Sequence, residues 1–541
     1  VPTIGFAVES DDALSYLTWE ISDGEATIIN CDIWASGELV IPSMIENCLV
    51  TSIGDHAFFR CVGLTSIKIP ESVTSIGAFA FSRCTGLKSM SIPKDVTNLG
   101  YGAFFNCTGL TSVTINNGVT SIGNYTFYKC SGITSVTIPN SVTSIGSRAF
   151  YGCTGLKNLE IPNSVTSIGS SAFYGCNGLK NLEIPYSVTS IGDGAIENCT
   201  ELTGINVNDK NTVYDSRNNC NAIIEKSTNT LIFGCKNTTI PDSITGIGDC
   251  AFAGCTGLTS IIIPESVTGI GYRAFYGCAG ITSIRIPDSA VRIGDNAFNG
   301  CTGITSITVD SDNSAYCSEN GVLYNKTKTE IIRFPCQKTD TSFIIPNGVT
   351  KIADGAFENC GNLTSIIIPD GVTSIGNEAF SNCQGLTSIT IPDGVTSIGS
   401  SAFYNCYFEK KDDKGKIILK GGLKEVTIPN TVTYIGNNAF LDCKKLENVY
   451  YIGNKTDWSN IEKGTKYSIP DDIINYLSGI NARFENGYIV VKPINIESGK
   501  NVILALYDGD KLVEMQQSSD YSESKKEITF ETAKGYTRAR V

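Results

Sequence analysis

The 541-residue sequence predicts a β-rich solenoid of stacked short coils, and three observations indicate this fold. One unit recurs every 23 residues, which is the sign of a repeat architecture. Within the unit, Pro and Gly separate three apolar clusters, and such a unit cannot bury its apolar side chains without neighbours. No apolar run approaches the ~20 residues that a membrane helix needs. The cysteines that mark the repeat are Cys61, Cys84, Cys107, Cys130, Cys153, Cys176 and Cys199, then Cys255, Cys278 and Cys301, then Cys360, Cys383 and Cys406, and finally Cys443.

The unit is clearest from Ile133 to Gly155. Apolar residues alternate with Ser and Thr up to Ile138, which is typical of a short strand. Pro139 ends the strand because proline donates no ladder hydrogen bond, and Gly146 permits the next turn. The other inward positions predicted for this unit are Val142, Ile145, Ala149, Phe150 and Cys153.

The domain organisation follows from where the repeat holds and where it is interrupted. Residues 1–56 are predicted to form an N-terminal cap and the first coils, and residues 57–452 the solenoid. Irregular coils with a hairpin are expected at 205–250 and 307–355, and an inserted loop at 407–420. The charged run 409–416 in this loop is interpreted as solvated, with partner docking as the alternative. Residues 453–483 are predicted to be a C-terminal cap and linker, and 484–541 a small β-sandwich-like module that continues past Val541.

Charge and composition exclude several classes of function. The chain has 41 Lys and Arg against 54 Asp and Glu, a net charge of −13, so nucleic acid and anionic membranes are not expected partners. A single histidine, His56, excludes most His-based catalytic and metal sites, and we interpret it as a surface residue of one repeat. Val1-Pro2-Thr3 lacks the basic and apolar features of a leader, so any export signal is expected to have been removed.

Three blocks recur in order in most units: Leu-Thr-Ser-Ile-x-Ile-Pro, Val-Thr-Ser-Ile-Gly and Ala-Phe-x-x-Cys. Over residues 19–452 this unit resembles the leucine-rich repeat of the BspA-like surface proteins. The segment 457–461, Asp-Trp-Ser-Asn-Ile, is similar to the one that often closes such arrays. The resemblance implies a leucine-rich repeat solenoid of short strands, turns and short helical pieces. It also implies a secreted or surface-attached bacterial protein that binds host or neighbouring-cell proteins, often as an adhesin.

The cysteines are interpreted mainly as buried free thiols. Fourteen occupy one place in the repeat, where cysteine acts as a small apolar residue. Three further pairs are predicted to be either bridged or free: Cys31 with Cys48, Cys220 with Cys235, and Cys317 with Cys336. Clustered CxxC spacing is absent, so we expect no metal and no cofactor.

Outward positions of the first strand form a polar file along the array. It is interpreted either as a solubilising face or as a flat protein-docking surface, and the scarcity of aromatic residues disfavours a sugar site. Glu160 and Glu183 lie one unit apart, but an open sheet cannot desolvate a substrate, and Lys157 and Lys180 are expected to neutralise them. We therefore predict no catalytic residues. The file members considered as protein-binding candidates are Lys68, Thr114, Thr137, Glu160, Glu183 and Arg285.

A second candidate surface follows the core Phe of each unit. Four consecutive units carry a ring there, and aromatic residues are enriched at interface hot spots. The alternative is that each ring leans on the neighbouring coil. The four are Phe105, Tyr128, Tyr151 and Tyr174.

The sequence as a whole predicts a non-enzymatic, extracellular, monomeric protein that mediates adhesion by binding a host or neighbouring-cell surface or matrix protein. Two alternatives stay open. The C-terminal module could bind polysaccharide, or the solenoid could be a spacer that holds this module away from the cell.

Overall fold

In the computed structural model, the described residues are 13–412, 415, 417–466 and 469–476, together with the backbone of the strands between 480 and 540. They belong to two compact units, Val1–Thr327 with Arg333–Lys338 and Lys328–Ile332 with Thr339–Val541. The N-terminal residues Val1–Thr3, three residues of the charged run (Asp413, Lys414 and Lys416) and the side chains of the C-terminal module lie outside the described residues.

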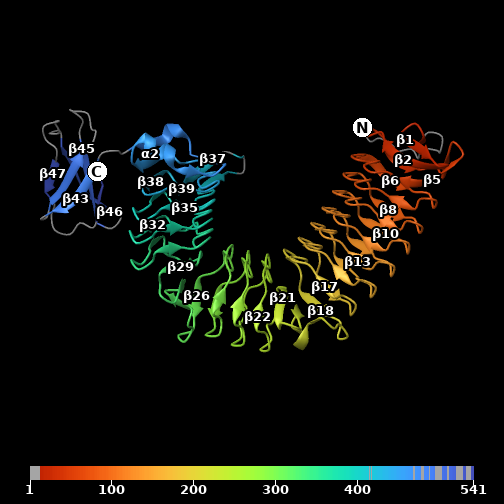
Figure 1. Cartoon of the computed structure of the whole chain (residues 1–541), viewed down its shortest axis with the longest axis horizontal. Helices are drawn as coiled ribbons and strands as arrows, with labels where there is room; N and C mark the ends of the chain where they lie inside the picture. The colour runs from red at the N-terminus through yellow and green to blue at the C-terminus, as the bar shows by residue number, and fades with distance from the viewer. Residues whose placement is uncertain are drawn as a thin grey trace. The chain divides into compact units, whose positions relative to one another are not determined.

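The predicted solenoid is confirmed. In the first unit, successive coils lie side by side in chain order (Figure 1), and most contribute two short strands that pair in parallel with those of the next coil, in two series; in the entry segment Leu17–Ser22 pairs antiparallel with Glu25–Cys31, and Met44–Ile45 with Cys48–Ile53. The register shifts by one repeat from coil to coil, so that Val113 pairs with Val136 and Ile122 with Ile145. Side chains alternate between exposed and buried along the first strand, as in Ser112–Ile115. The apolar positions of the repeat therefore form one continuous core.

The strands of the first unit keep these two series. The first series is β3 (Ser36–Val40), β6 (Gly63–Lys68), β8 (Ser89–Ile92), β10 (Ser112–Ile115), β12 (Ser135–Thr137), β14 (Asn158–Leu159), β16 (Asn181–Ile184), β18 (Gly204–Val207), β24 (Ser283–Ile286) and β26 (Ser306–Val309). The second is β1 (Leu17–Ser22), β2 (Glu25–Cys31), β4 (Met44–Ile45), β5 (Cys48–Ile53), β7 (Ser75–Ile76), β9 (Asn98–Leu99), β11 (Ser121–Ile122), β13 (Ser144–Ile145), β15 (Ser167–Ile168), β17 (Ser190–Ile191), β22 (Gly246–Ile247), β23 (Gly269–Ile270) and β25 (Arg292–Ile293).

The third side of each coil is a turn, not a regular helix. The core rings of Phe58 through Phe173 stack along it, with centroids 5.1 to 5.6 Å apart. The residue before each repeat cysteine has a left-handed backbone, as at Lys129 (φ 55°) and Gly152 (φ 69°). This conformation strains a side-chain-bearing residue and suits glycine.

The repeat cysteine does more than fill space. The Cys130 thiol donates a hydrogen bond of 2.9 Å to the carbonyl oxygen of Phe104 in the preceding coil. The same bond recurs in both units, for example from Cys278 to Phe252 in the first and from Cys383 to Phe357 in the second, both at 3.1 Å. Most repeat cysteines therefore join two neighbouring coils, a role that the interpretation as a small apolar residue did not include.

Both irregular coils of the first unit contain antiparallel hairpins. A buried Asn anchors each coil, since Asn211 and Asn313 each donate to two carbonyls of the preceding coil and accept two backbone N–H groups. The elements are β19 (Tyr214–Asp215), η1 (Arg217–Asn219), β20 (Ala222–Glu225) and β21 (Thr230–Gly234) in one coil, and β27 (Tyr316–Glu319) and β28 (Val322–Asn325) in the other.

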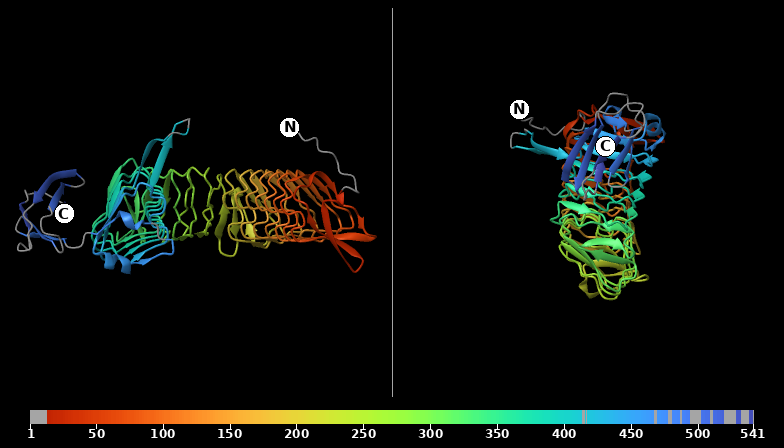
Figure 2. Two further views of the ribbon diagram at one scale, coloured as in Figure 1. Left: turned by 90° about the horizontal axis from the view of Figure 1, so that it is seen from above. Right: turned by 90° about the vertical axis from the view of Figure 1, so that its left-hand side faces the viewer.

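The second unit continues the repeat and adds a hairpin between two coils. β36 (Tyr407–Lys411) pairs with β37 (Ile417–Gly422), and Figure 2 shows this hairpin projecting from the coils of its unit. The other strands are β29 (Glu330–Arg333), β30 (Ser342–Ile344), β31 (Lys351–Ile352), β32 (Ser365–Ile367), β33 (Ser374–Ile375), β34 (Ser388–Thr390), β35 (Ser397–Ile398), β38 (Glu425–Pro429), β39 (Tyr434–Ile435), β40 (Asn448–Ile452), β41 (Glu462–Lys463) and β42 (Ile474–Tyr476).

A short helix, α2 (Lys455–Asn460), follows the last repeat strands. Asn454 and Asp457 form a reciprocal capping box at its start, which satisfies backbone N–H groups that a helix end leaves open. Trp458 is buried with its ring centroid 5.0 Å from that of Tyr451. A 3-10 turn, η2 (Asp471–Ile473), precedes β42.

The strands beyond β42 form two three-stranded antiparallel sheets. One has the order β43 (Ile480–Glu485), β44 (Tyr488–Pro493) and β47 (Ile528–Glu531). The other has the order β46 (Lys511–Ser518), β45 (Val502–Asp508) and β48 (Arg538–Arg540).

Candidate binding surfaces

All 21 cysteines are free thiols in the structure, including the three pairs that the sequence left open. Cys31 lies beside Cys61, whose thiol donates to the Cys31 carbonyl at 3.7 Å, and this neighbour belongs to the next coil. Burial raises the pKa of the Cys220 thiol to about 11 and that of the Cys199 thiol to about 12. Because the thiolate is the nucleophile, these cysteines are unreactive at neutral pH.

The predicted aromatic file is a continuous stack of rings. Phe105, Tyr128, Tyr151 and Tyr174 lie with consecutive centroids 4.6, 4.8 and 4.6 Å apart, and all four are half-buried. Each ring therefore does lean on its neighbours, and part of each side chain remains exposed.

The structure adds a second row of rings that the sequence analysis missed. His56, Phe79, Tyr101 and Tyr125 follow one another at 5.2, 5.3 and 4.9 Å. The rows meet where the ring of Tyr125 lies 5.4 Å from that of Tyr128. Phe79 and Tyr125 both have left-handed backbones. The sequence alone does not show that this backbone conformation recurs here, so the second row could not be predicted. We call the two rows, together with Phe59, the aromatic surface.

Cations surround the aromatic surface. The guanidinium groups of Arg60 and Arg83 lie 5.5 and 6.0 Å from the Phe59 ring centre, and Lys129 Nζ lies 5.5 Å from that of Tyr128. Arg148 lies 5.5 Å from the Tyr125 ring centre. Such pairs are favourable because the ring face is negative. The tyrosine row ends at Glu197, and burial raises the pKa of its carboxyl group.

The outward file of the strand face is not uniform. Lys68 forms an ion pair of 2.7 Å with Glu38, and Arg285 pairs with Glu265 at 2.6 Å and with Asp310. Thr114 and Thr137 are exposed and uncharged. The cationic candidates on this face are therefore already neutralised.

Glu160 and Glu183 differ from the other charged members. Both are exposed, and within the described residues neither forms an ion pair or a side-chain hydrogen bond. The expectation that Lys157 and Lys180 neutralise them is wrong, because no ion pair joins these lysines to either carboxylate. Each lysine lies just before its strand and three residues before its glutamate, which is ~10 Å along an extended chain.

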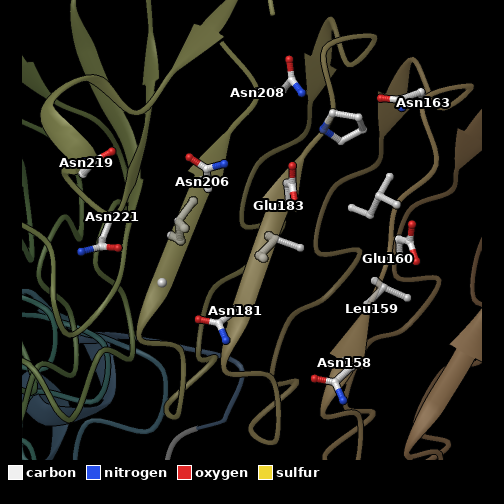
Figure 3. Close-up of a pocket in the computed structure, with 15 residues that line it drawn as sticks. Asn158, Leu159, Glu160, Asn163, Asn181, Glu183, Asn206, Asn208, Asn219 and Asn221 are labelled. Atoms are coloured by element: carbon white, nitrogen blue, oxygen red, sulfur yellow. The ribbon is translucent and has the colours of Figure 1, made fainter. Parts of the chain in front are cut away.

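The two glutamates line a hollow of about 550 Å³ on the strand face. Figure 3 shows it spread over β14, β16 and β18, with Asn219 and Asn221 of the irregular coil at one side. We call it the asparagine groove. Six of the amides that line it are Asn158, Asn163, Asn181, Asn206, Asn219 and Asn221.

Comparison with known proteins identifies the repeat. The family model of the BspA type leucine rich repeat region, in six copies, matches residues 51–153, 120–232, 223–342, 336–411 and 419–465. The chain belongs to this family. BspA-type leucine-rich repeat arrays are interaction scaffolds and are generally non-enzymatic.

Several solved structures are similar to this BspA-type chain. A leucine rich cell surface protein from Faecalibacterium prausnitzii is 27% identical, with 85% of this chain and 98% of that chain covered and a TM-score of 0.35. A leucine-rich repeat protein from Bacteroides ovatus is 25% identical, with coverages of 86% and 98% and a TM-score of 0.39. One from Eubacterium ventriosum is 24% identical, with coverages of 72% and 92% and a TM-score of 0.44. No curated protein matches the chain.

The described residues of this BspA-type chain contain neither a metal-ligand cluster nor a membrane-spanning helix. No group of three or more His, Cys, Asp or Glu side chains in that part of the chain is placed to hold a metal ion. No helix there is both long enough and apolar enough to cross a membrane.

Proposed function

We propose that the chain is a bacterial surface or secreted protein that mediates adhesion by binding a host or neighbouring-cell protein through the aromatic surface. The observation that carries this proposal is the unbroken stack of half-exposed rings from Phe105 to Tyr174, with cations at its margin. Tyr, Phe and Arg are the residue types enriched in interface cores. A solenoid core needs no aromatic residue at these positions, since the Phe stack inside already fills it.

The energetics favour a protein partner. Stacked tyrosines are rigid and lose little conformational entropy when a partner covers them. Their hydroxyl groups can hydrogen-bond at the rim while the ring faces supply apolar area. The family relationship supports a scaffold role, and one similar structure is named a cell surface protein.

The test uses the full chain with Tyr128, Tyr151 and Tyr174 all replaced by Ser. We expect binding to an immobilised partner, selected from a panel of purified extracellular matrix and epithelial surface proteins, to weaken at least about tenfold, because hot-spot residues carry about 2 kcal/mol or more. Thermal unfolding should change little, since these rings are half-exposed. The matched control replaces Tyr186, Tyr404 and Tyr434, which lie outside the aromatic surface.

Two results would overturn the proposal. One is equal binding by the wild type and the triple variant to every captured protein. The other is binding that survives on a glycan array alone and is retained by the C-terminal module, which would support the polysaccharide alternative.

A further inference from the structure

The asparagine groove differs in its chemistry from the aromatic surface. Its lining includes two carboxylates and seven amides and contains no cationic and no aromatic side chain. The neighbouring coils carry Ser and Thr at the equivalent outward positions, as at Ser135 and Thr137. The change to Asn and Glu therefore begins at β14, the first of the three strands that line the groove.

The amides of the groove are available to a ligand. Within the described residues, the side chains of Asn158, Asn181 and Asn206 form no hydrogen bond with the protein. An asparagine side chain offers both a donor and an acceptor. This is the pairing that the N–H and C=O groups of an extended peptide backbone require.

The groove also has a defined charge preference. Glu160 and Glu183 hold the same outward position on successive coils, so the carboxylates lie about one strand spacing apart, ~4.8 Å. Among the described residues no cation forms an ion pair with either glutamate, whereas Lys68 and Arg285 in the same file are paired with acids. Alternate side chains of an extended peptide point to one side and repeat every ~6.6 Å, so two such cations can reach both carboxylates.

Gly204 creates the room at the centre of the groove. It pairs with Asn181 in register, and a Cβ added there would lie 2.6 Å from Asn181 Oδ1 and 3.9 Å from Asn221 Oδ1. The absence of a side chain on this residue therefore separates the amide of the strand from the amide of the irregular coil. A bulkier residue at this position would fill the space between them.

Other ligand classes fit the lining less well. Sugar rings usually stack on aromatic side chains, and none lines the groove. A divalent cation prefers six or more oxygen ligands held close together, and the described residues hold no group of three acidic, His or Cys side chains suited to a metal.

We propose that the asparagine groove binds an extended segment of a partner protein that carries alternating Lys or Arg residues. The amides pair with the backbone of the segment and the two glutamates select its cations. Three strands and the adjoining coil span ~15 to 19 Å, which matches about five extended residues. The inference deepens the proposed function because it names the chemistry of a protein partner, and it is tested without that partner.

The experiment measures binding of a fluorescent twelve-residue peptide of alternating Lys and Ser to the full chain at low ionic strength. Glu160→Gln with Glu183→Gln should weaken binding about tenfold, as expected for the loss of two exposed ion pairs. Gly204→Val should weaken it at least as much while leaving both charges in place. The matched control is Asp370→Asn with Asp393→Asn, which removes two exposed carboxylates one coil apart outside the groove. It should leave binding within about twofold, because distant charges are screened.

Several outcomes would overturn the inference. Equal loss in the control would mean that the peptide senses only the net charge of the chain. Equal binding of a Glu-Ser peptide would remove the charge preference, and binding of neutral oligosaccharides that Gly204→Val abolishes would make the groove a sugar site. The variant at Tyr128, Tyr151 and Tyr174 should keep full peptide binding, so failure of this inference and failure of the proposed function can be told apart.

Discussion

The bond from each repeat cysteine to the preceding coil makes a sharp prediction about stability. Cys130 is fully buried, and its thiol donates to the Phe104 carbonyl at 2.9 Å. The same carbonyl also accepts the Cys107 N–H at 3.2 Å. Cys130→Ala removes the thiol bond and the sulfur atom, whereas Cys130→Ser keeps a donor in nearly the same place.

The magnitude follows from two contributions. A weak intramolecular hydrogen bond is worth about 0.5 to 1 kcal/mol, and burial of one further apolar heavy atom about 1 kcal/mol. The Phe104 carbonyl keeps its second partner, so no desolvation penalty is added. We therefore expect Cys130→Ala to lower the local free energy of unfolding by about 2 kcal/mol, and Cys130→Ser by about 1 kcal/mol.

The assay is amide hydrogen exchange measured by mass spectrometry over the segment from Phe104 to Cys130. It reports local opening, which matters because long repeat arrays need not unfold in one step. Cys48→Ala is the control, because Cys48 is half-buried and its thiol has no hydrogen bond in the described structure. If Ala is as stable as Cys, or if Ser is less stable than Ala, the cysteine is only an apolar filler and the reasoning fails.

Three further predictions follow from the structure. Burial raises the pKa of the Cys153 and Cys176 thiols well above the ordinary value. Their contribution is therefore complete below the unfolded thiol pKa of about 8.5 and is lost as pH rises toward the folded pKa, so the free energy of unfolding in urea should fall between pH 9 and pH 10 by about 1 kcal/mol per buried thiol. Burial also raises the pKa of Glu197, so the folded state holds this proton more tightly than the unfolded chain. The free energy of unfolding should then fall as pH rises above the ordinary carboxyl range. Glu197→Gln should make the free energy of unfolding less dependent on pH in that range. Finally, Lys129→Gly should raise stability by up to about 1 kcal/mol, because Lys129 has a left-handed backbone where other repeats carry Gly152 and Gly175; unchanged melting would contradict this.

The coil architecture could be predicted from the sequence because its causes are local and repeated. The interval between cysteines, the strand-ending prolines and the inward Phe residues each recur in nearly every unit. The left-handed turns and the thiol bonds could not be predicted in this way. Both depend on how one coil meets the next, as in the contact of Cys130 with Phe104.

The candidate site was only partly predictable for the same reason. The rings from Phe105 to Tyr174 recur at a constant sequence interval, so this row could be predicted. Tyr101 and Tyr125 do not hold the same position in their repeats, so their contacts with each other and with Tyr128 could not be predicted. Glu160 and Glu183 were recognised as a pair. Their groove was missed because Asn219 and Asn221 come from the irregular coil, although the change from Ser to Asn at position 181 was a usable signal.

The hairpin β36–β37 leaves the coil stack and returns to it at one hydrogen bond, from the Leu423 N–H to the Cys406 carbonyl at 2.9 Å. The flanking strands keep their normal pairing across this excursion, with Ser388 opposite Glu425. Another sequence, of any length, could replace the hairpin if its two ends lie as close together as the ends of the hairpin do. The coils on either side would keep their pairing. A new domain could therefore be inserted between Cys406 and Leu423, by evolution or by protein engineering, while the rest of the solenoid stays unchanged.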